Sequence, residues 1–297
     1  MAQIDATYDA LDAQVKPICA PLFATGQYGV GGHTETSINA TATFVKYRER
    51  IYAVTCHHVL AAFLAAAVKQ KLPFVPSLHN GRAILHLGTY GPNGSFAWSF
   101  RSCRSFPTAE EIVHDDQAAT LARDRSNADL PDIAIAEITS VWPSLIQQRN
   151  ARALDLDTWE QPDWSETQSV WVAFGYPDGH KYEQDGKLAV PMPKVRAEQQ
   201  TSRLDQRESF VLCSPLGEDH GWGFSGMSGG PIFAPHKTKD CFYFAGITYE
   251  GSPGLRDAEG DDEAFLTKAD ILLRGYLISP AAFERWLELA QYGVATS

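Results

Sequence analysis

Short runs rich in β-branched and aromatic residues recur along the chain, separated by polar or glycine-containing segments. Residues 41–47 and 51–55 are the clearest pair, and the charged segment 48–50 between them predicts a β-hairpin. Runs of similar character follow at residues 82–87, 133–138, 169–177, 210–213 and 241–249. Many short strands with few helices predict an all-β fold of barrels or sandwiches.

Helical patterns are confined to three segments. The first twenty residues carry apolar side chains at loosely helical spacing up to Pro17, and residues 60–68 are alanine-rich. Near the end of the chain, Ser279 and Pro280 fit the N-cap and N1 positions of a helix. Its apolar face is made by Phe283, Trp286, Leu287 and Ala290.

Composition narrows the classes of function. The chain has 297 residues, 44% of them hydrophobic, which is enough for one large or two smaller domains. Its 36 acidic and 25 basic residues give a net charge of −11, which argues against a nucleic-acid-binding surface. No run of about 18 apolar residues predicts a membrane span. We therefore expect neither nucleic acid nor membrane as a partner.

The cysteines indicate the redox environment. There are five, an odd number without a C-x-x-C pair, which argues against a disulfide framework and against a structural zinc site. The N-terminus has no basic segment followed by an apolar one, so we expect a cytoplasmic protein with reduced thiols. Residues 107–128 and the acidic residues 257–263 predict surface loops, and the second lacks the ligand spacing of a calcium loop. The sequence predicts no metal and no cofactor.

Residues 225–233, Ser-Gly-Met-Ser-Gly-Gly-Pro-Ile-Phe, are the densest candidate for chemistry. Glycines on both sides of Ser228 allow positive φ and leave amide N–H groups pointing into open space. The amides of Gly226 and Ser228 are spaced so that both can bind one developing oxyanion. Taken alone, the segment is equally consistent with an ordinary turn.

A serine hydroxyl becomes a strong nucleophile when a base accepts its proton and a carboxylate orients that base. His58 comes directly after the predicted strand 51–55, so the pair His57 and His58 is predicted at a strand end. Asp132 leads directly into a short apolar strand. Each side chain therefore has a rigid strand terminus to aim it.

Three blocks of sequence together resemble the signatures of trypsin-like (chymotrypsin-fold) serine proteases, in the order His, Asp, Ser. They are Val54-Thr55-Cys56-His57-His58-Val59, Asp132-Ile133-Ala134-Ile135 and Gly226-Met227-Ser228-Gly229-Gly230-Pro231. The similarity spans roughly residues 20–292. The terminal helix and Phe174-Gly175-Tyr176-Pro177 are similar to bacterial members.

The resemblance implies two antiparallel six-stranded β-barrels followed by a C-terminal α-helix, with peptide or protein as substrate. It implies that His58 is the general base, Asp132 its orienting carboxylate and Ser228 the nucleophile, with the Gly226 and Ser228 amides as the oxyanion hole. The corresponding domain boundaries are 1–19 for a lead-in segment, 20–145 for the first barrel, 146–165 for a linker, 166–278 for the second barrel and 279–297 for the helix.

Alternatives exist for each member of the triad. His57 is the alternative base, Asp129 the alternative carboxylate and Ser225 the alternative nucleophile. The sequence around Ser228 also fits the G-x-S-x-G pattern of α/β-hydrolases. Those enzymes place their histidine well after the serine, whereas the only later histidine here is His236, eight residues on.

The chain departs from the family in ways that bear on activation. Met227 stands where secreted relatives carry the aspartate that pairs with a new N-terminus, so we expect the site to form without propeptide removal. Val59 replaces the cysteine that follows the catalytic histidine, and Cys56 precedes it instead, so the usual disulfide has no counterpart.

The resemblance also implies which residues would set specificity. Trp222 is expected near the base of the primary pocket, although it equally fits a packing role, and Thr248, Tyr249, Glu250 and Gly251 are expected to pair with substrate backbone. No acidic residue falls at the pocket base. The alternative function is a catalytically silent pseudoprotease that binds peptides, and the sequence identifies no partner protein.

Overall fold

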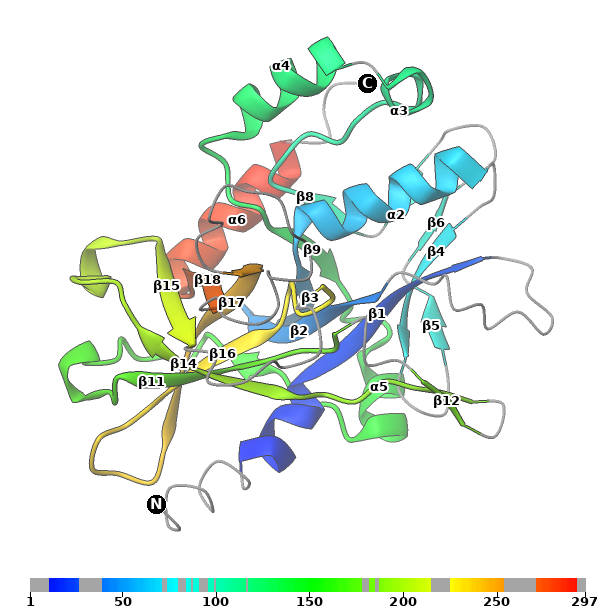
Figure 1. Ribbon diagram of the computed structural model, residues 1–297. Helices are drawn as coiled ribbons and strands as arrows, with labels where there is room; N and C mark the ends of the chain where they lie inside the picture. The colour runs from blue at the N-terminus through cyan, green and yellow to red at the C-terminus, as the bar shows by residue number, and fades with distance from the viewer. Residues whose placement is uncertain are drawn as a thin grey trace.

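The strands of the molecule belong mainly to two sheets, one from each half of the chain (Figure 1). The computed structural model describes residues 11–26, 39–70, 74–79, 84–86, 88–90, 96–98, 100–115, 117–177, 182–184, 187–214, 225–253 and 271–292. The predicted turn at 91–94, the acidic segment 257–263 and Trp222 lie outside these residues.

The first half forms an eight-stranded sheet in the order β5-β4-β1-β2-β3-β9-β8, with β10 running parallel to β2. Its strands are β1 (Cys19–Gly26), β2 (Asn39–Tyr47), β3 (Arg50–Thr55), β4 (Phe74–His79), β5 (Ile84–His86), β8 (Phe100–Ser102), β9 (Ala134–Glu137) and β10 (Leu154–Asp155). The pairing of β2 with β3 is the hairpin predicted from residues 41–55. A separate two-stranded sheet joins β6 (Gly88–Tyr90) to β7 (Phe96–Trp98).

The second half forms a closed six-stranded barrel in the order β11-β14-β15-β18-β17-β16, and every pairing in it is antiparallel. Its strands are β11 (Val170–Phe174), β14 (Lys194–Gln199), β15 (Ser209–Ser214), β16 (Pro231–Pro235), β17 (Phe242–Pro253) and β18 (Ile271–Leu277). The hairpin of β12 (Tyr182–Gln184) and β13 (Lys187–Ala189) lies outside it.

One of the two predicted barrels is therefore present. In the first half, the pairings between described residues give a sheet with β5 and β8 at its ends, and the parallel β10–β2 pair departs from a purely antiparallel barrel. A closed first barrel stays a prediction. The fold is predominantly β rather than all-β, because several helices accompany the sheets.

The helices are α2 (His57–Gln70), α3 (Ala109–His114), α4 (Gln117–Asn127), α5 (Trp142–Arg149) and α6 (Pro280–Tyr292), with short 3₁₀ turns η1 (Lys16–Ile18), η2 (Trp164–Glu166) and η4 (Leu204–Gln206). The sequence pattern predicted α2 and α6 but not α3, α4 or α5. None of the helices within the described residues is both long enough and apolar enough to cross a bilayer.

The segment 107–128, predicted as a loop, is instead largely helical, since it forms α3 and α4 (top of Figure 1). Thr108 and Glu111 form a reciprocal capping box that stabilises the start of α3. Neither helix buries an apolar residue. Ala109 and Ile112 of α3 are only partly buried, against Leu64, Ala67 and Val68 of α2. Because the buried apolar surface is small, no strong amphipathic pattern marked these helices.

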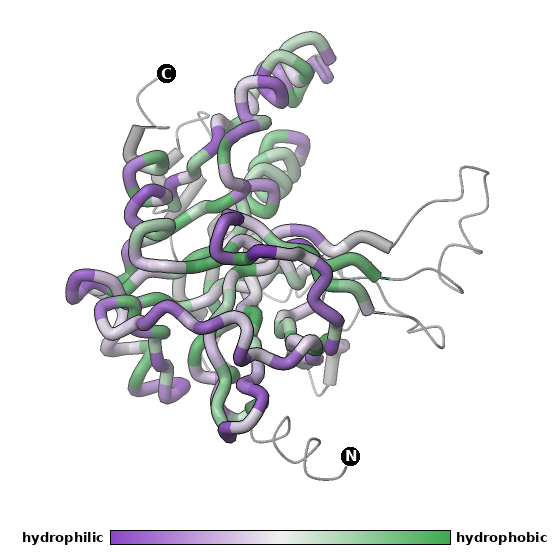
Figure 2. Tube along the Cα trace, turned by 90° about the vertical axis from the view of Figure 1, so that its left-hand side faces the viewer, coloured by the Kyte–Doolittle hydropathy of each residue, from purple (hydrophilic) through white to green (hydrophobic). Residues whose placement is uncertain are grey.

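One of several hydrophobic clusters joins the two halves. Val45 and Val54 of the first sheet share it with Phe174, Phe233 and Ile247 of the barrel. In Figure 2, hydrophobic segments gather in the middle of the molecule and hydrophilic ones at its turns. This shared core holds β2 against the loop that precedes β16.

Helix α6 follows the barrel but packs on the first sheet. Phe283 is fully buried and meets the rings of Tyr47 and Tyr52 edge-on at centroid distances of 5.5 and 5.4 Å. The predicted cap is confirmed, because the Ala282 amide donates to Ser279 Oγ at 3.0 Å. The helix thus ties the end of the chain to the first half.

Candidate active site

His58, Asp132 and Ser228 form one continuous chain of hydrogen bonds. The distance from Asp132 Oδ2 to His58 Nδ1 is 2.6 Å, and that from His58 Nε2 to Ser228 Oγ is 2.9 Å. The side chain of Asp132 is 10% exposed, whereas that of His58 is 48% exposed. The carboxylate is thus shielded, while the imidazole and the serine can be reached from outside.

The two adjacent histidines follow the end of β3 at Thr55, as predicted, but they themselves form the first turn of α2. His57 is buried, with Nδ1 2.7 Å from Ser102 Oγ and its ring 4.7 Å from that of Phe106. The pKa of His57 is lowered to about 4, and burial of the ring is the main cause. Helical geometry, rather than strand alternation, directs the two rings to different surroundings.

Backbone contacts fix Asp132 just before β9. Its Oδ1 accepts the His58 amide at 3.0 Å, and its own amide donates to the Tyr276 hydroxyl at 3.0 Å. Burial acts to raise the pKa of Asp132, but the hydrogen bonds and charge of His58 outweigh it, so the pKa lies below its ordinary value. Asp132 is therefore held as a carboxylate facing the imidazole.

Ser228 occupies the corner of a tight turn. The Gly230 amide donates to the Met227 carbonyl at 2.9 Å, and Gly229 has φ +89°, as the third position of a type II turn requires. A Cβ on Gly229 would lie 2.0 Å from the Thr41 carbonyl oxygen. Both conformation and space therefore demand glycine beside the serine.

Strand β2 holds the carbonyl groups of this turn. Thr41 donates its hydroxyl to Gly226 O at 2.8 Å and its amide to Ser228 O at 3.1 Å, while Thr43 donates its hydroxyl to Gly229 O at 2.7 Å. These contacts turn the carbonyl oxygens toward β2.

Two amide N–H groups of the turn, unlike its carbonyl groups, do not bond to β2. Among hydrogen bonds between described residues, none uses the amide N–H of Gly226 or of Ser228. Gly226 has φ +96°, a conformation that favours glycine. Two donors beside the serine hydroxyl are thus available to an incoming oxygen.

A cavity of about 530 Å³ opens over the three residues. The described residues that line it are Asn39, His58, Val59, Ala62, Arg104, Asp132, Ser225, Gly226, Ser228, Tyr249, Glu250 and Gly251. Of the predicted substrate-binding residues, Tyr249, Glu250 and Gly251 line it. Thr248 is buried, and its backbone binds the Gly229 amide and the Gly230 carbonyl instead.

The register of β17 shifts between Thr248 and Glu250, beside the cavity. Strand β16 pairs with β17 from Phe242 only as far as Ile247. Beyond that point, β17 pairs on one side with β18, and its other edge has no strand partner among the described residues. Within the described part of the chain, the edge of β17 beyond Thr248 is therefore unpaired next to Ser228.

Several residues of the site carried no recognisable signal in the sequence. Asn39 and Arg104 line the cavity, Thr41 and Thr43 hold the serine turn, and Tyr276 binds the backbone of Asp132. Each acts through a contact with a distant segment. No local pattern marks such a residue.

Asp129 and Ser225 take no part in this chain of hydrogen bonds. Both are exposed, and Ser225 lines the cavity, but no hydrogen bond among the described residues joins it to His57 or His58. No three His, Cys, Asp or Glu side chains converge as metal ligands in the described part of the chain. None of the five cysteines forms a disulfide.

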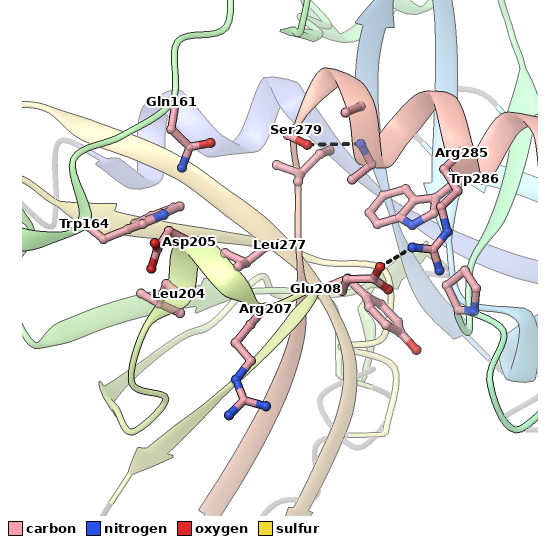
Figure 3. Close-up of a pocket in the computed structure, with 15 residues that line it drawn as sticks. Gln161, Trp164, Leu204, Asp205, Arg207, Glu208, Leu277, Ser279, Arg285 and Trp286 are labelled. Carbon is pink, nitrogen blue, oxygen red and sulfur yellow. Dashed lines mark hydrogen bonds and ion pairs between the residues drawn. The ribbon is translucent and has the colours of Figure 1, made fainter.

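A second cavity of about 330 Å³ lies beside the start of α6 (Figure 3). Trp164, Leu204, Arg207 and Trp286 line it, and an ion pair joins Arg285 to Glu208 at its edge. Its serine, Ser279, caps α6 and has no histidine beside it in the lining. The hydrogen-bonded chain of His58, Asp132 and Ser228 makes the first cavity the candidate active site.

No protein-family model and no curated protein matches the sequence. Among solved structures, the chain is similar to a thermostable serine protease, AL20, from an extremophilic microorganism, with 14% identity, 93% of this chain and 98% of that chain covered, and a TM-score of 0.42. It is also similar to the protease Anisep from Arthrobacter nicotinovorans, with 12% identity, 93% and 96% covered, and a TM-score of 0.41. Because these values are low, the proposal below rests on the geometry of the site.

Proposed function

We propose that this chain is a serine endopeptidase that hydrolyses peptide bonds through an acyl-enzyme intermediate, on a chymotrypsin-like fold. The observation that carries the proposal is the chain of hydrogen bonds from Asp132 through His58 to Ser228, at 2.6 and 2.9 Å. The turn around Ser228 adds two available amides, and the cavity above it gives access.

The chemistry follows from the position of each atom. Ser228 Oγ attacks the scissile carbonyl while His58 Nε2 accepts its proton, and Asp132 Oδ2 holds Nδ1–H so that Nε2 is the free base. The carbonyl oxygen, now negative, accepts hydrogen bonds from the amides of Gly226 and Ser228.

The second half of the reaction reuses the same groups. His58 passes its proton to the leaving amine as the tetrahedral intermediate collapses to an acyl-enzyme. A water molecule, deprotonated by His58, then attacks the ester and releases Ser228. Each of these steps uses only the side chains, amides and water named above.

The edge of β17 beyond Thr248 gives the substrate a place to bind. An extended peptide laid along Tyr249, Glu250 and Gly251 would add a strand to the barrel and bring its scissile bond over Ser228. This supports a protein or peptide as the substrate. The five free thiols favour a reducing compartment, and on that ground we assign the protein to the cytoplasm.

Steady-state kinetics on a peptide library test the function. Ser228→Ala and His58→Ala are each expected to lower kcat by several orders of magnitude, on the order of 10⁶ as in a comparable triad. Ser225→Ala distinguishes the alternative nucleophile and is expected to retain turnover. Saturable peptide binding without turnover in the wild type would instead favour the pseudoprotease function, and undiminished turnover in Ser228→Ala would reject the triad.

A further inference from the structure

The described lining of the active-site cavity contains one side chain with a permanent positive charge, Arg104. Arg104 follows β8 and is partly buried. Its neighbour Cys103 donates its amide to Ile133 O at 3.0 Å, so this segment lies directly beside Asp132. Arg104 is thus held on the same side of the cavity as the carboxylate of the triad.

Two hydrogen bonds fix Arg104 without using the end of its guanidinium. Its amide donates to Ser102 Oγ at 3.0 Å and its Nε donates to Leu130 O at 2.9 Å. The bond from Nε holds the plane of the group. Among hydrogen bonds and ion pairs between described residues, none involves its two terminal nitrogens, which leaves four N–H donors.

Some arginines of the chain have acidic partners, whereas the partly buried Arg149 bonds to the carbonyls of Lys16 and Cys19. Arg50 pairs with Glu137 and Arg123 pairs with Glu111, each at 3.0 Å. Arg104 has no such carboxylate among the described residues, although the chain has a net charge of −11. A partly buried guanidinium without a carboxylate is uncommon, because burial of a charge is costly unless the charge is paired.

The acidic groups that line the cavity are already engaged. Both oxygens of Asp132 bind His58, at 3.0 and 2.6 Å. Glu250 lies 3.7 Å from Arg274, so its charge is offset. The charge of Arg104 helps to lower the pKa of Asp132, but no hydrogen bond or ion pair among the described residues joins that carboxylate to the guanidinium.

We propose that Arg104 binds a carboxylate side chain of the substrate, so that cleavage favours peptides with Asp or Glu close to the scissile bond. The inference rests on the proposed peptidase function. A guanidinium fixed through Nε presents its terminal N–H groups as a rigid fork, which matches a carboxylate. Only the His58 ring separates Asp132 from Ser228, so a side chain reaching Arg104 belongs to a residue near the bond being cleaved.

Paired peptides test this preference. Each pair carries Glu or Gln at one of the two positions on either side of the cleaved bond, and all peptides are acetylated and amidated. For wild type, kcat/KM for the Glu peptide is expected to exceed that for the Gln peptide by roughly 10- to 100-fold at one position, as for a hydrogen-bonded charge. Arg104→Gln should abolish this ratio, and Arg104→Lys should retain part of it.

Arg101→Gln provides a matched control. Arg101 lies three residues earlier, is exposed on β8 and lines a different cavity, so its loss changes net charge equally and should leave the Glu/Gln ratio intact. Thermal unfolding of each variant checks that it folds. An equal loss of ratio in both variants would attribute the preference to net charge and overturn the role of Arg104.

The remaining outcomes separate the two proposals. Cleavage of Glu and Gln peptides at equal rates by wild type would overturn the role of Arg104 and leave the peptidase function standing. A preference seen only with free-acid peptides would assign Arg104 to a terminal carboxylate and contradict the side-chain proposal. Failure to cleave any peptide, together with failure of Ser228 to react with a fluorophosphonate, would reject the peptidase function itself.

Discussion

His57 and His58 are neighbours in the sequence, yet their surroundings differ in ways that fit them for different tasks. His57 is buried against Ser102 and Phe106, and its pKa is lowered to about 4. His58 is half exposed and bonded to Asp132 and Ser228. The buried ring is therefore neutral near pH 7, which adds no positive charge behind the triad.

The lowered pKa of His57 predicts how stability depends on pH. Unfolding exposes a histidine with a pKa near 6.5, so acid favours the unfolded chain. His57 makes its full contribution to the free energy of unfolding above about pH 6.5. This contribution is lost as the pH falls towards about 4, by roughly 3 kcal/mol in total. Denaturant titrations at pH 7, 5.5 and 4.5 should show a steeper loss for wild type than for His57→Gln. Equal pH dependence in the two proteins would contradict the assignment.

At the scale of elements, β2 acts as the frame for the serine turn. Thr41 alone binds the turn twice and accepts the Tyr176 amide at 2.9 Å. The hydroxyl groups that hold the turn belong to Thr41 and Thr43, on a strand whose sequence looks like that of an ordinary β-hairpin. They bind the serine turn only because the fold places that turn against β2.

Thr41→Val should therefore impair both stability and activity. Valine has nearly the same shape, but it leaves the Gly226 carbonyl and the Tyr176 amide unpaired, at a cost of about 1–3 kcal/mol for each buried group. Loss of a positioned turn should also lower kcat/KM by about tenfold or more. The control is Thr139→Val, which removes an exposed hydroxyl that binds the Ile51 amide on a different part of the sheet. Unfolding curves and steady-state kinetics compare the two variants. Equal losses of stability and of kcat/KM in Thr41→Val and Thr139→Val would contradict the role of β2.

Sequence pattern predicted elements unevenly, for physical reasons. The hairpin of β2 and β3 and the helix α6 were visible because burial imposes a period on their side chains. Helices α3 and α4 bury no apolar face, so their polar sequence looked like a loop. Within the predicted linker region, α5 and β10 are short, and β10 depends on pairing with β2.

For the whole molecule, the site depends on contacts between segments far apart in the chain. The Thr41 hydroxyl and the Gly226 carbonyl are 185 residues apart, and the Asp132 amide and the Tyr276 hydroxyl are 144 apart. His58, Asp132 and Ser228, which the structure brings together, could be picked out because they lie in recognisable sequence blocks. Thr41, Tyr276 and Arg104 were not, because only folding brings them to the site.

The five thiols make a prediction about the folded protein as a whole. Cys19, Cys56 and Cys103 are buried, and burial raises the pKa of each thiol, to about 12 for Cys19 and Cys103. Cys241 is exposed. Iodoacetamide should therefore modify Cys241 first in the native protein and reach the three buried thiols only on unfolding. Peptide mapping by mass spectrometry checks this order, and a disulfide or early modification of Cys56 would contradict it.

Met227 is fully buried beside Ser228 and offers no carboxylate to bind a new N-terminus. We therefore expect the turn to be formed in the chain without proteolytic processing. The contacts of Thr41, Thr43 and Thr248 supply the support that orders it. Reaction of Ser228 with a fluorophosphonate in the uncleaved chain would agree with this expectation.

Covalent labelling of Ser228 tests the central claim most directly. The unprocessed protein is treated with a fluorophosphonate, and the modified peptide is mapped by mass spectrometry. We predict stoichiometric modification at Ser228, loss of labelling in Ser228→Ala, and strongly slowed labelling in His58→Ala because the base is absent. Labelling that maps to another serine, or that persists in Ser228→Ala, would contradict the assignment of Ser228 as nucleophile.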